Sequence, residues 1–212
     1  MTSTIKRLHR YCQAHSTAPN TVLQELERET HLKTLAPQML SGPLQGQLLQ
    51  MISYMIQPKC ILEVGTFTGY ASLCLAAGLT AEGQLHTIEA NEELEYLIRK
   101  YIRKADMEQQ IQLHIGDAKT LIPQMDQQFD LVFIDAGKQD NALYFDLIID
   151  KVRPGGYLLA DNVLWSGKVA DSQYQDRDTQ VIRAFNQKVQ QDPRVENVML
   201  PLRDGLIILR KH

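Results

Sequence analysis

The chain reads Glu63-Val64-Gly65-Thr66-Phe67-Thr68-Gly69-Tyr70 at the end of its first short apolar run. The run, Cys60–Val64, predicts a buried strand, and the residues after Gly69 predict a helix. Glycines at such a turn let a ligand approach the backbone. The spacing is G-x-x-x-G and differs from the G-x-G-x-x-G of dinucleotide-binding proteins. A carboxylate at Glu63 would repel a pyrophosphate but could bind an ammonium or a hydroxyl.

Short apolar runs alternate with helical segments over most of the chain, which is typical of a mainly parallel sheet with helices on both faces. Strands are expected at Cys60–Val64, Leu85–Ile88, Ile111–Ile115, Leu131–Ile134 and Tyr157–Ala160. Helices are expected at Tyr70–Leu79, Glu92–Lys104, Ala118–Met125 and Leu143–Val152. Two further runs, Val195–Leu200 and Leu206–Leu209, flank an Asp-Gly pair and predict an antiparallel hairpin. The fold class is therefore α/β and Rossmann-like, with a mainly parallel seven-stranded sheet that this hairpin closes.

The N-terminal region has a different pattern from the rest. Thr21–His31 and Leu44–Ile56 have apolar residues at helical spacing. We expect residues 1–57 to be a helical cover on a Rossmann-like core, residues 58–212, within a single domain of 212 residues.

Composition narrows the classes of partner. The net charge of −3 and pI of about 6.1 give no electrostatic case for nucleic acid. No apolar run approaches the ~20 residues that span a bilayer, and the first residues lack the apolar region of a signal peptide. The cysteines, Cys12, Cys60 and Cys74, show no CxxC spacing. We expect reduced thiols and a cytoplasmic protein.

Polar residues at the ends of the second and third strands suit a nucleoside. Glu89 ends the second strand, where an acid can bind a ribose diol. Gly116, Asp117 and Ala118 follow the third strand, where an adenine edge could lie. With Glu63, they favour a phosphate-free nucleoside that carries a cationic tail. S-adenosylmethionine fits this description better than NAD, although the glycines alone could simply make a tight turn.

Oxygen-bearing side chains follow the fourth and fifth strands. Asp135 ends one strand, and Asp161 with Asn162 ends the other. In a parallel sheet both sets lie at the carboxyl edge, beside the cofactor crevice. Two carboxylates and an amide oxygen suit Mg²⁺, with Ca²⁺ or Mn²⁺ as alternatives. The alternative interpretation is that Asp161 and Asn162 cap a helix and Asp135 is an ordinary loop residue.

Lys138 lies three residues after Asp135 and is a candidate catalytic residue together with it. A metal with open positions can hold both oxygens of a catechol-like diol and lower the pKa of its hydroxyl. Lys138 would then accept the proton or only position the acceptor, and the residues leave this open. A solvated surface lysine is the alternative.

These motifs together resemble the metal-dependent class I O-methyltransferases, the group of catechol and caffeoyl-CoA O-methyltransferases, from about residue 35 to the end. The resemblance implies an S-adenosylmethionine-dependent O-methyltransferase that acts on a vicinal dihydroxy aromatic or a hydroxycinnamoyl ester, as a homodimer joined through the N-terminal helices. It implies cofactor contacts at Ser41, Glu63, Gly65, Thr66, Gly69, Ala71, Glu89, Asp117, Ala118 and Asp135. It assigns the metal to Asp135, Asp161 and Asn162, the base to Lys138, and the residue against the acceptor ring to Trp165.

Four places depart from that family pattern. Ala71 replaces a serine whose hydroxyl Ser72 could supply instead, and Gly137 replaces an aspartate. Asp140–Asn141 replaces an Asn-Tyr pair, and Pro201 replaces the acid of the animal catechol enzymes. These changes favour the bacterial caffeoyl-CoA-like group. An RNA or protein methyltransferase, a non-catalytic cofactor-binding module and an NAD oxidoreductase are the alternatives. We expect residues 30–45 and a mobile polar loop, Gly167–Asp178, to cover the site.

Overall fold

The structure is a computed structural model that describes residues 3–212. Its longer helices are α1 (Ser3–Ala14), α2 (Thr21–Lys33), α3 (Gly42–Ile56), α4 (Tyr70–Ala76), α5 (Glu95–Lys104), α7 (Asn141–Ile148) and α8 (Arg177–Gln191). Its strands are β1 (Cys60–Val64), β2 (Gln84–Glu89), β3 (Ile111–Ile115), β4 (Phe129–Ile134), β5 (Val152–Asp161), β6 (Val195–Leu200) and β7 (Leu206–Lys211). The short elements are α6 (Ala118–Leu121) and the 3₁₀ turns η1 (Pro37–Met39), η2 (Glu92–Leu94), η3 (Ile122–Gln124), η4 (Lys138–Asp140), η5 (Ile149–Lys151) and η6 (Trp165–Ala170).

All seven strands form one sheet, in the order β3-β2-β1-β4-β5-β7-β6. Strands β1 to β5 are parallel, and β7 pairs antiparallel with both β5 and β6. The predicted parallel sheet with an antiparallel C-terminal hairpin is confirmed. The strand order reverses at β1 and β4, and open α/β sheets bind ligands in the crevice at such a point.

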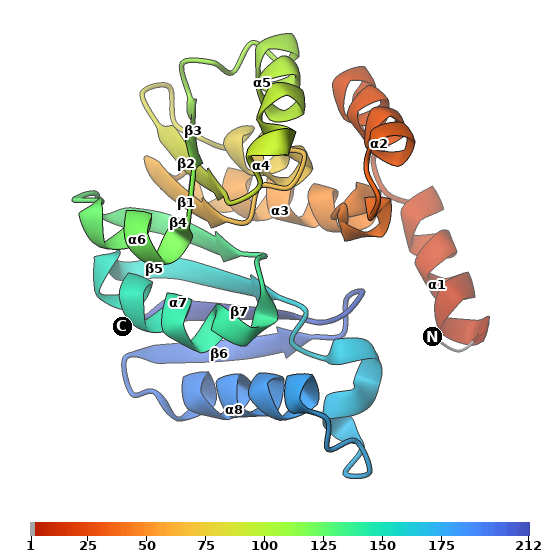
Figure 1. The fold of residues 1–212 in the computed structure, drawn as a ribbon, viewed down its shortest axis with the longest axis vertical. Coiled ribbons are helices and arrows are strands. Elements are labelled where there is room, and N and C mark those ends of the chain that lie inside the picture. Colours follow the sequence, from red (N-terminus) through yellow and green to blue (C-terminus); the bar gives the residue numbers. More distant parts are fainter. Residues whose placement is uncertain (1–2) are drawn as a thin grey trace.

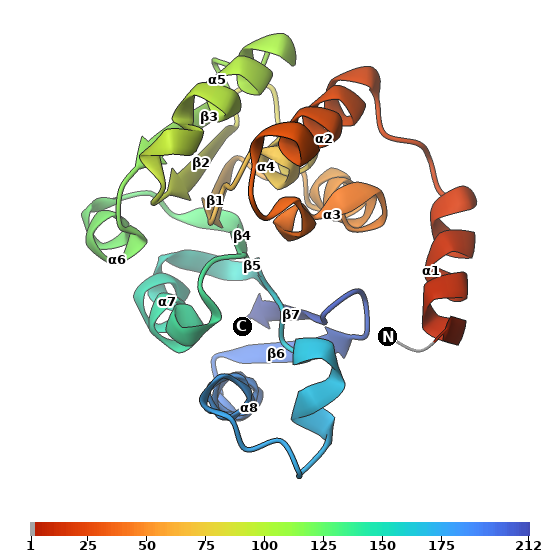
Figure 2. The ribbon, with the colours of Figure 1, turned by 45° about the vertical axis from the view of Figure 1, so that its right-hand side comes forward.

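Both faces of the sheet are buried, which explains why its central strands are apolar throughout. In β1, Ile61 and Leu62 are both fully buried, but Ile61 packs in the core that α2 to α5 cover and Leu62 in the core under α6 to α8. Phe133 and Ile134 divide in the same way in β4. Figure 2 shows α2 and α3 on one side of the sheet and α6 to α8 on the other.

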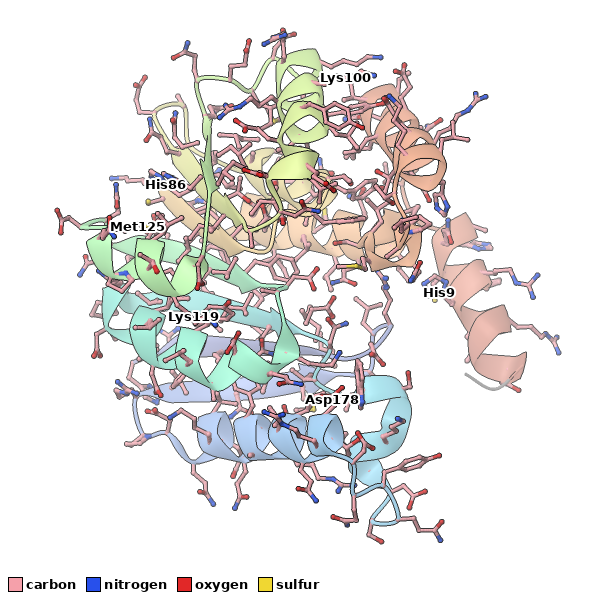
Figure 3. All side chains as sticks on the ribbon, viewed as in Figure 1. His9, His86, Lys100, Lys119, Met125 and Asp178 are labelled. Carbon is pink, nitrogen blue, oxygen red and sulfur yellow. The ribbon has the colours of Figure 1, made fainter. Side chains whose placement is uncertain are left out.

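The N-terminal helices differ in how closely they join the core. Leu23 and Leu26 of α2 are buried in the core. Glu29 of α2 accepts a hydrogen bond from Lys100 of α5 at 2.5 Å, and Figure 3 shows Lys100 at the upper end of α5. By contrast, α1 lies at the margin of the molecule, away from the sheet (Figure 1). None of the helices in residues 3–212 is both long and apolar enough to span a bilayer.

The structure differs from the prediction at one strand and at one helix. Strand β5 begins at Val152, which we had expected to end a helix, because the chain continues as strand through Pro154-Gly155-Gly156. Gly155 adopts φ +73° there, and the register with β4 shifts. Helix α8 was not predicted at all, and it includes Asp178, the last residue of the expected loop. Figure 3 shows Asp178 at one end of α8.

Candidate active site

A cavity of about 1080 Å³ opens at the carboxyl ends of strands β1 to β5. That volume lies at the upper end of the range for small-molecule sites, so it has room for a nucleoside and a second ligand. Residues from five strand ends line it, namely Val64, Gly65, Ile88, Glu89, Gly116, Asp117, Ala118, Asp135, Ala136, Gly137, Lys138, Asp161 and Asn162. The segment Lys33–Met39 borders the same cavity, and so do Trp165 and Arg203.

The turn after β1 is held against the loop that follows β4. The amide of Asp135 donates to the carbonyl of Val64 at 2.9 Å, and the amide of Gly65 donates to the carbonyl of Ile88 at 3.0 Å. Gly65 adopts φ +97°, and a Cβ there would lie 2.2 Å from the backbone oxygen of Asp135. Glycine is therefore required at position 65 both by conformation and by space. The turn places backbone atoms of Gly65 on the cavity wall.

Glu89 lies beside that turn and is positioned by backbone amides. Its Oε2 accepts from the amide of Phe67 at 2.7 Å, and its Oε1 accepts from that of Asn91 at 2.8 Å. A carboxylate has about four acceptor sites, so each oxygen can still accept one more hydrogen bond. Asp117 caps α6, and its Oδ1 accepts from the amide of Lys119 at 2.9 Å. Glu89 and Asp117 thus form a side of the cavity that fits the diol and the base of a nucleoside.

Five of the expected cofactor residues do not line the cavity. Ser41, Glu63, Thr66 and Ala71 are buried, and Gly69 begins α4 with φ +92°. The hydroxyl of Thr66 lies 2.5 Å from that of Thr87, within the core. The side chains of Glu63 and Thr66 are therefore occupied within the core, on the far side of the turn from the cavity.

Glu63 points into the protein between β2 and α4. Its Oε2 accepts from the hydroxyl of Thr87 at 2.5 Å and from that of Ser72, while its Oε1 has no hydrogen-bond partner within residues 3–212. Burial raises the pKa of Glu63 to about 7. Because the Ser72 hydroxyl is committed to Glu63, the idea that Ser72 replaces the serine missing at Ala71 was wrong.

Two aspartates lie together on the floor of the cavity. Burial raises the pKa of Asp135 well above its ordinary value, and neighbouring Asp161 raises it further. Burial also raises the pKa of Asp161, against the hydrogen bond that Gln45 Nε2 donates to its Oδ2 at 2.9 Å. Within residues 3–212 no cationic side chain lies within 4.0 Å of either carboxylate. Two buried carboxylates without an ion-pair partner favour binding of a cation.

Asn162 completes this group of oxygen-bearing residues. It follows Asp161 directly, lines the same cavity, and adopts φ +63°, a conformation that asparagine tolerates better than most residues. Asp161 Oδ1 accepts from the Asn162 amide at 2.8 Å. The set of two carboxylates and one amide oxygen fits Mg²⁺, which binds oxygen ligands and retains positions for water or substrate.

Lys138 and Trp165 meet at the mouth of the cavity. The Nζ atom of Lys138 lies 3.6 Å from the centre of the Trp165 ring, a cation–π contact. Trp165 and Ser166 adopt φ +49° and +54°, which is uncommon for residues other than glycine. Asp204 stabilises this backbone, because its carbonyl accepts from the amide of Leu164 at 2.8 Å and its side chain accepts from that of Ser166.

The sequence and the fold are similar to those of known proteins. A family model described as O-methyltransferase matches residues 13–212. Over 219 residues the chain is 30% identical to caffeoyl-CoA O-methyltransferase of Stellaria longipes, which covers 97% of this chain and 90% of that protein. The chain belongs to the O-methyltransferase family.

A curated animal relative and a crystal structure agree with this assignment. The chain is 34% identical over 172 residues to catechol O-methyltransferase domain-containing protein 1 of Mus musculus, covering 79% of this chain and 66% of that protein. The chain thus spans just under two thirds of the mouse protein. An O-methyltransferase from Bacillus cereus in complex with SAH is 29% identical, with a TM-score of 0.89 over 97% of both chains.

The second cover that we expected for this O-methyltransferase family member was wrong. No residue of Gly167–Asp178 lines the cavity, whereas Asn162 and Trp165, which precede that loop, do. Nor is the loop free of constraints. Arg183 of α8 donates to four of its carbonyls, those of Lys168, Val169, Asp171 and Tyr174, at 2.6 to 3.0 Å.

Sequence reasoning also missed two residues of the site. Gln45 lies in α3 and reaches Asp161, 116 residues away. Arg203 lies in the turn between β6 and β7 and reaches the carbonyl of Leu40 at 2.8 Å. Nothing in the chain's local pattern links these pairs, since only the folded topology brings the N-terminal helices next to the C-terminal hairpin.

Proposed function

We propose that the chain is an S-adenosylmethionine-dependent, divalent-metal-assisted O-methyltransferase that acts on a vicinal dihydroxy aromatic. One observation carries the proposal: Asp135, Asp161 and Asn162 share a single cavity with Glu89 and with the Lys138–Trp165 pair. The reaction needs a surface for the nucleoside, a site for a cation and a surface for the aromatic acceptor. We call these the wall (Glu89 and Asp117), the floor (Asp135, Asp161 and Asn162) and the mouth (Lys138 and Trp165) of the cavity.

The floor residues would hold the metal, which Mg²⁺ fits best. When bound, a divalent cation supplies charge that lowers the pKa of an acceptor hydroxyl and fixes its position. Asp135 and Asp161 provide the negative charge, and Gln45 keeps the Asp161 carboxylate oriented from the opposite side. The raised pKa values of both aspartates also mean that the protein pays a cost for ionising them without a cation.

The mouth residues would hold the acceptor. Trp165 offers a ring face beside the floor, and aromatic rings pack well on such a face. Lys138 lies over that ring and can move from it to an acceptor oxygen, where it positions the hydroxyl or takes its proton. A closed, dry cavity then favours methyl transfer, because opposite charges are lost in the transition state.

An acceptor panel tests the proposal. Methyl transfer should be assayed with Mg²⁺ on catechol, caffeate and a caffeoyl thioester, with monohydroxy analogues and tRNA as comparators. Vicinal diols should be methylated and the other substrates should not be. Preferential methylation of tRNA, of a protein, or of monohydroxy compounds would contradict the proposed substrate class, and failure to bind S-adenosylmethionine would contradict the cofactor.

We further propose a homodimer and a cytoplasmic location. Apolar side chains are exposed on α1 and α3, namely Leu8, Tyr11, Met51, Tyr54 and Met55. Their grouping on the two helices supports a dimer through the N-terminal region. The free thiols of all three cysteines support a reducing compartment.

A further inference from the structure

Arg203 connects two parts of the chain that border the cavity from opposite ends of the sequence. It lies in the turn between β6 and β7 and adopts φ +50°. Its Nη1 donates to the carbonyls of Leu40 and Ser41, and its Nη2 donates to that of Gln38 at 3.4 Å. One planar guanidinium thus contacts three carbonyls of residues 38–41.

The cover that borders the cavity is anchored at one end and loosely packed at the other. Leu40 is buried in the core, whereas Leu35 and Met39, which line the cavity, are mainly exposed. The 3₁₀ turn η1 between them has two amide hydrogen bonds, from Met39 to the carbonyl of Ala36 and from Leu40 to that of Pro37. A short turn with exposed apolar residues opens easily unless another element holds it.

The same hairpin turn also holds the other border of the cavity. Asp204, next to Arg203, accepts hydrogen bonds from the amides of Leu164 and Ser166, as described above. Val163 donates to the carbonyl of Gly205 at 3.2 Å. Residues 203–205 therefore join the N-terminal cover to the segment that carries Asn162 and Trp165.

We propose that Arg203 is a positioning residue that clamps residues 38–41 over the cavity and so slows the release of the nucleoside cofactor. The identity of the cofactor in this proposal rests on the proposed function, whereas the contact between Arg203 and residues 38–41 does not. A guanidinium is suited to this role because its fixed fork reaches several carbonyls at once, which the single ammonium of a lysine does not do in the same geometry.

Arg203→Met tests the clamp, because it keeps much of the apolar stem and removes the fork. Hydrogen–deuterium exchange of the protein without added ligand should accelerate about tenfold or more at the amides of Met39 and Leu40. Arg203→Lys should recover only part of the protection. Arg210→Met is the matched control, since Arg210 lies on β7 and pairs with the exposed Glu196. Unfolding curves establish that all three variants fold.

The cofactor measurements follow in the same variants. Release of S-adenosylmethionine, measured by stopped-flow fluorescence, should be about tenfold faster in Arg203→Met, with a raised KM for the cofactor. Unchanged exchange at Met39 and Leu40 would overturn the clamp. Full rescue of that protection by Arg203→Lys would also overturn it, because charge alone would then suffice. If no variant or wild-type protein bound the cofactor, the proposed function would fail while the exchange data still decided the clamp.

Discussion

Asp135 is a buried carboxyl whose position is unfavourable for stability and suited to the proposed function. Its carboxylate is desolvated and lies next to Asp161, so ionisation at neutral pH is costly in the folded state. Residues placed at such a cost are common at functional sites. A bound divalent cation would remove the conflict by neutralising both charges.

Asp135→Asn should therefore separate stability from activity. We expect kcat/KM for a diol to fall by about 100-fold or more, since a metal ligand is lost. The Tm without added metal should rise, because one of two neighbouring buried charges disappears, and added Mg²⁺ should stabilise only the wild-type protein. Asp140→Asn is the control, because Asp140 pairs with Lys119 outside the cavity. A lower Tm for Asp135→Asn would contradict the argument.

Glu63 makes a pH-dependent contribution to stability. Its pKa rises from 4.5 to about 7 on folding, so the folded state holds one more proton than the unfolded state between these values. This contribution is fully present below pH 4.5 and is lost as the pH rises through 7, by up to ~1.4 kcal/mol per pH unit. Glu63→Gln has no such loss. The free energy of unfolding of the variant, measured with urea, should therefore increase relative to that of the wild type between pH 5 and pH 8. If the two free energies changed with pH in parallel, the pKa of Glu63 would not be raised on folding.

At the scale of elements, most strands were predictable from the sequence, whereas the polar helix α8 was not. The central strand β1 and the edge strand β3 have the predicted limits, because apolar runs between glycine-rich and polar turns are a strong signal. The sequence does contain a helix signal for α8. Asp176 caps the helix by accepting a hydrogen bond from the amide of Thr179. In addition, Ile182, Phe185 and Val189 are buried at helical spacing. This signal was overlooked because charged and amide residues dominate that stretch.

Elements also explain which part of the site the sequence could predict. Residues that end strands, such as Glu89, Asp135 and Asp161, line the cavity because parallel strands end at one edge. Residues that act by reaching across elements, such as Arg203, depend on contacts between segments far apart in the chain. Glu63 was predicted to line the cavity and does not. It precedes the cavity-lining Val64 in β1, and successive side chains of a strand point to opposite faces of the sheet.

Arg183 should control the order of the segment between η6 and α8. Arg183→Met removes the donor to four loop carbonyls, so we expect chymotrypsin to cleave at Tyr174 about tenfold faster in the folded protein. Arg210→Met serves again as the control. Equal cleavage rates in both variants would mean that the loop is held by other contacts. Retained cofactor affinity is expected, because the loop does not line the cavity.

At the scale of the whole molecule, α1 and α3 carry exposed apolar side chains. Met55 is 73% exposed on α3, in a region where we propose the dimer contact. Met55→Glu should raise the dimer dissociation constant by at least tenfold in sedimentation equilibrium, because a charge enters an apolar contact. Val198→Glu, on edge strand β6, is the control. Dissociation by Val198→Glu alone, or a monomeric wild type, would contradict the proposal.

The architecture places all three parts of the proposed chemistry at one edge of one sheet. The wall comes from the ends of β2 and β3, the floor from those of β4 and β5, and the mouth from the segments after β4 and β5. The hairpin β6–β7 then ties the cover to that mouth. The proposed activity therefore requires that Asp135, Asp161 and Asn162 bind a metal.

The decisive measurement is the initial rate of methyl transfer from S-adenosylmethionine to caffeate as Mg²⁺ is titrated against EDTA. We expect the rate to rise with free Mg²⁺, to saturate, and to fall to background in excess EDTA, while calorimetry still detects cofactor binding in the chelator. A rate that is unchanged in excess EDTA would contradict the central claim that Asp135, Asp161 and Asn162 hold a catalytic metal.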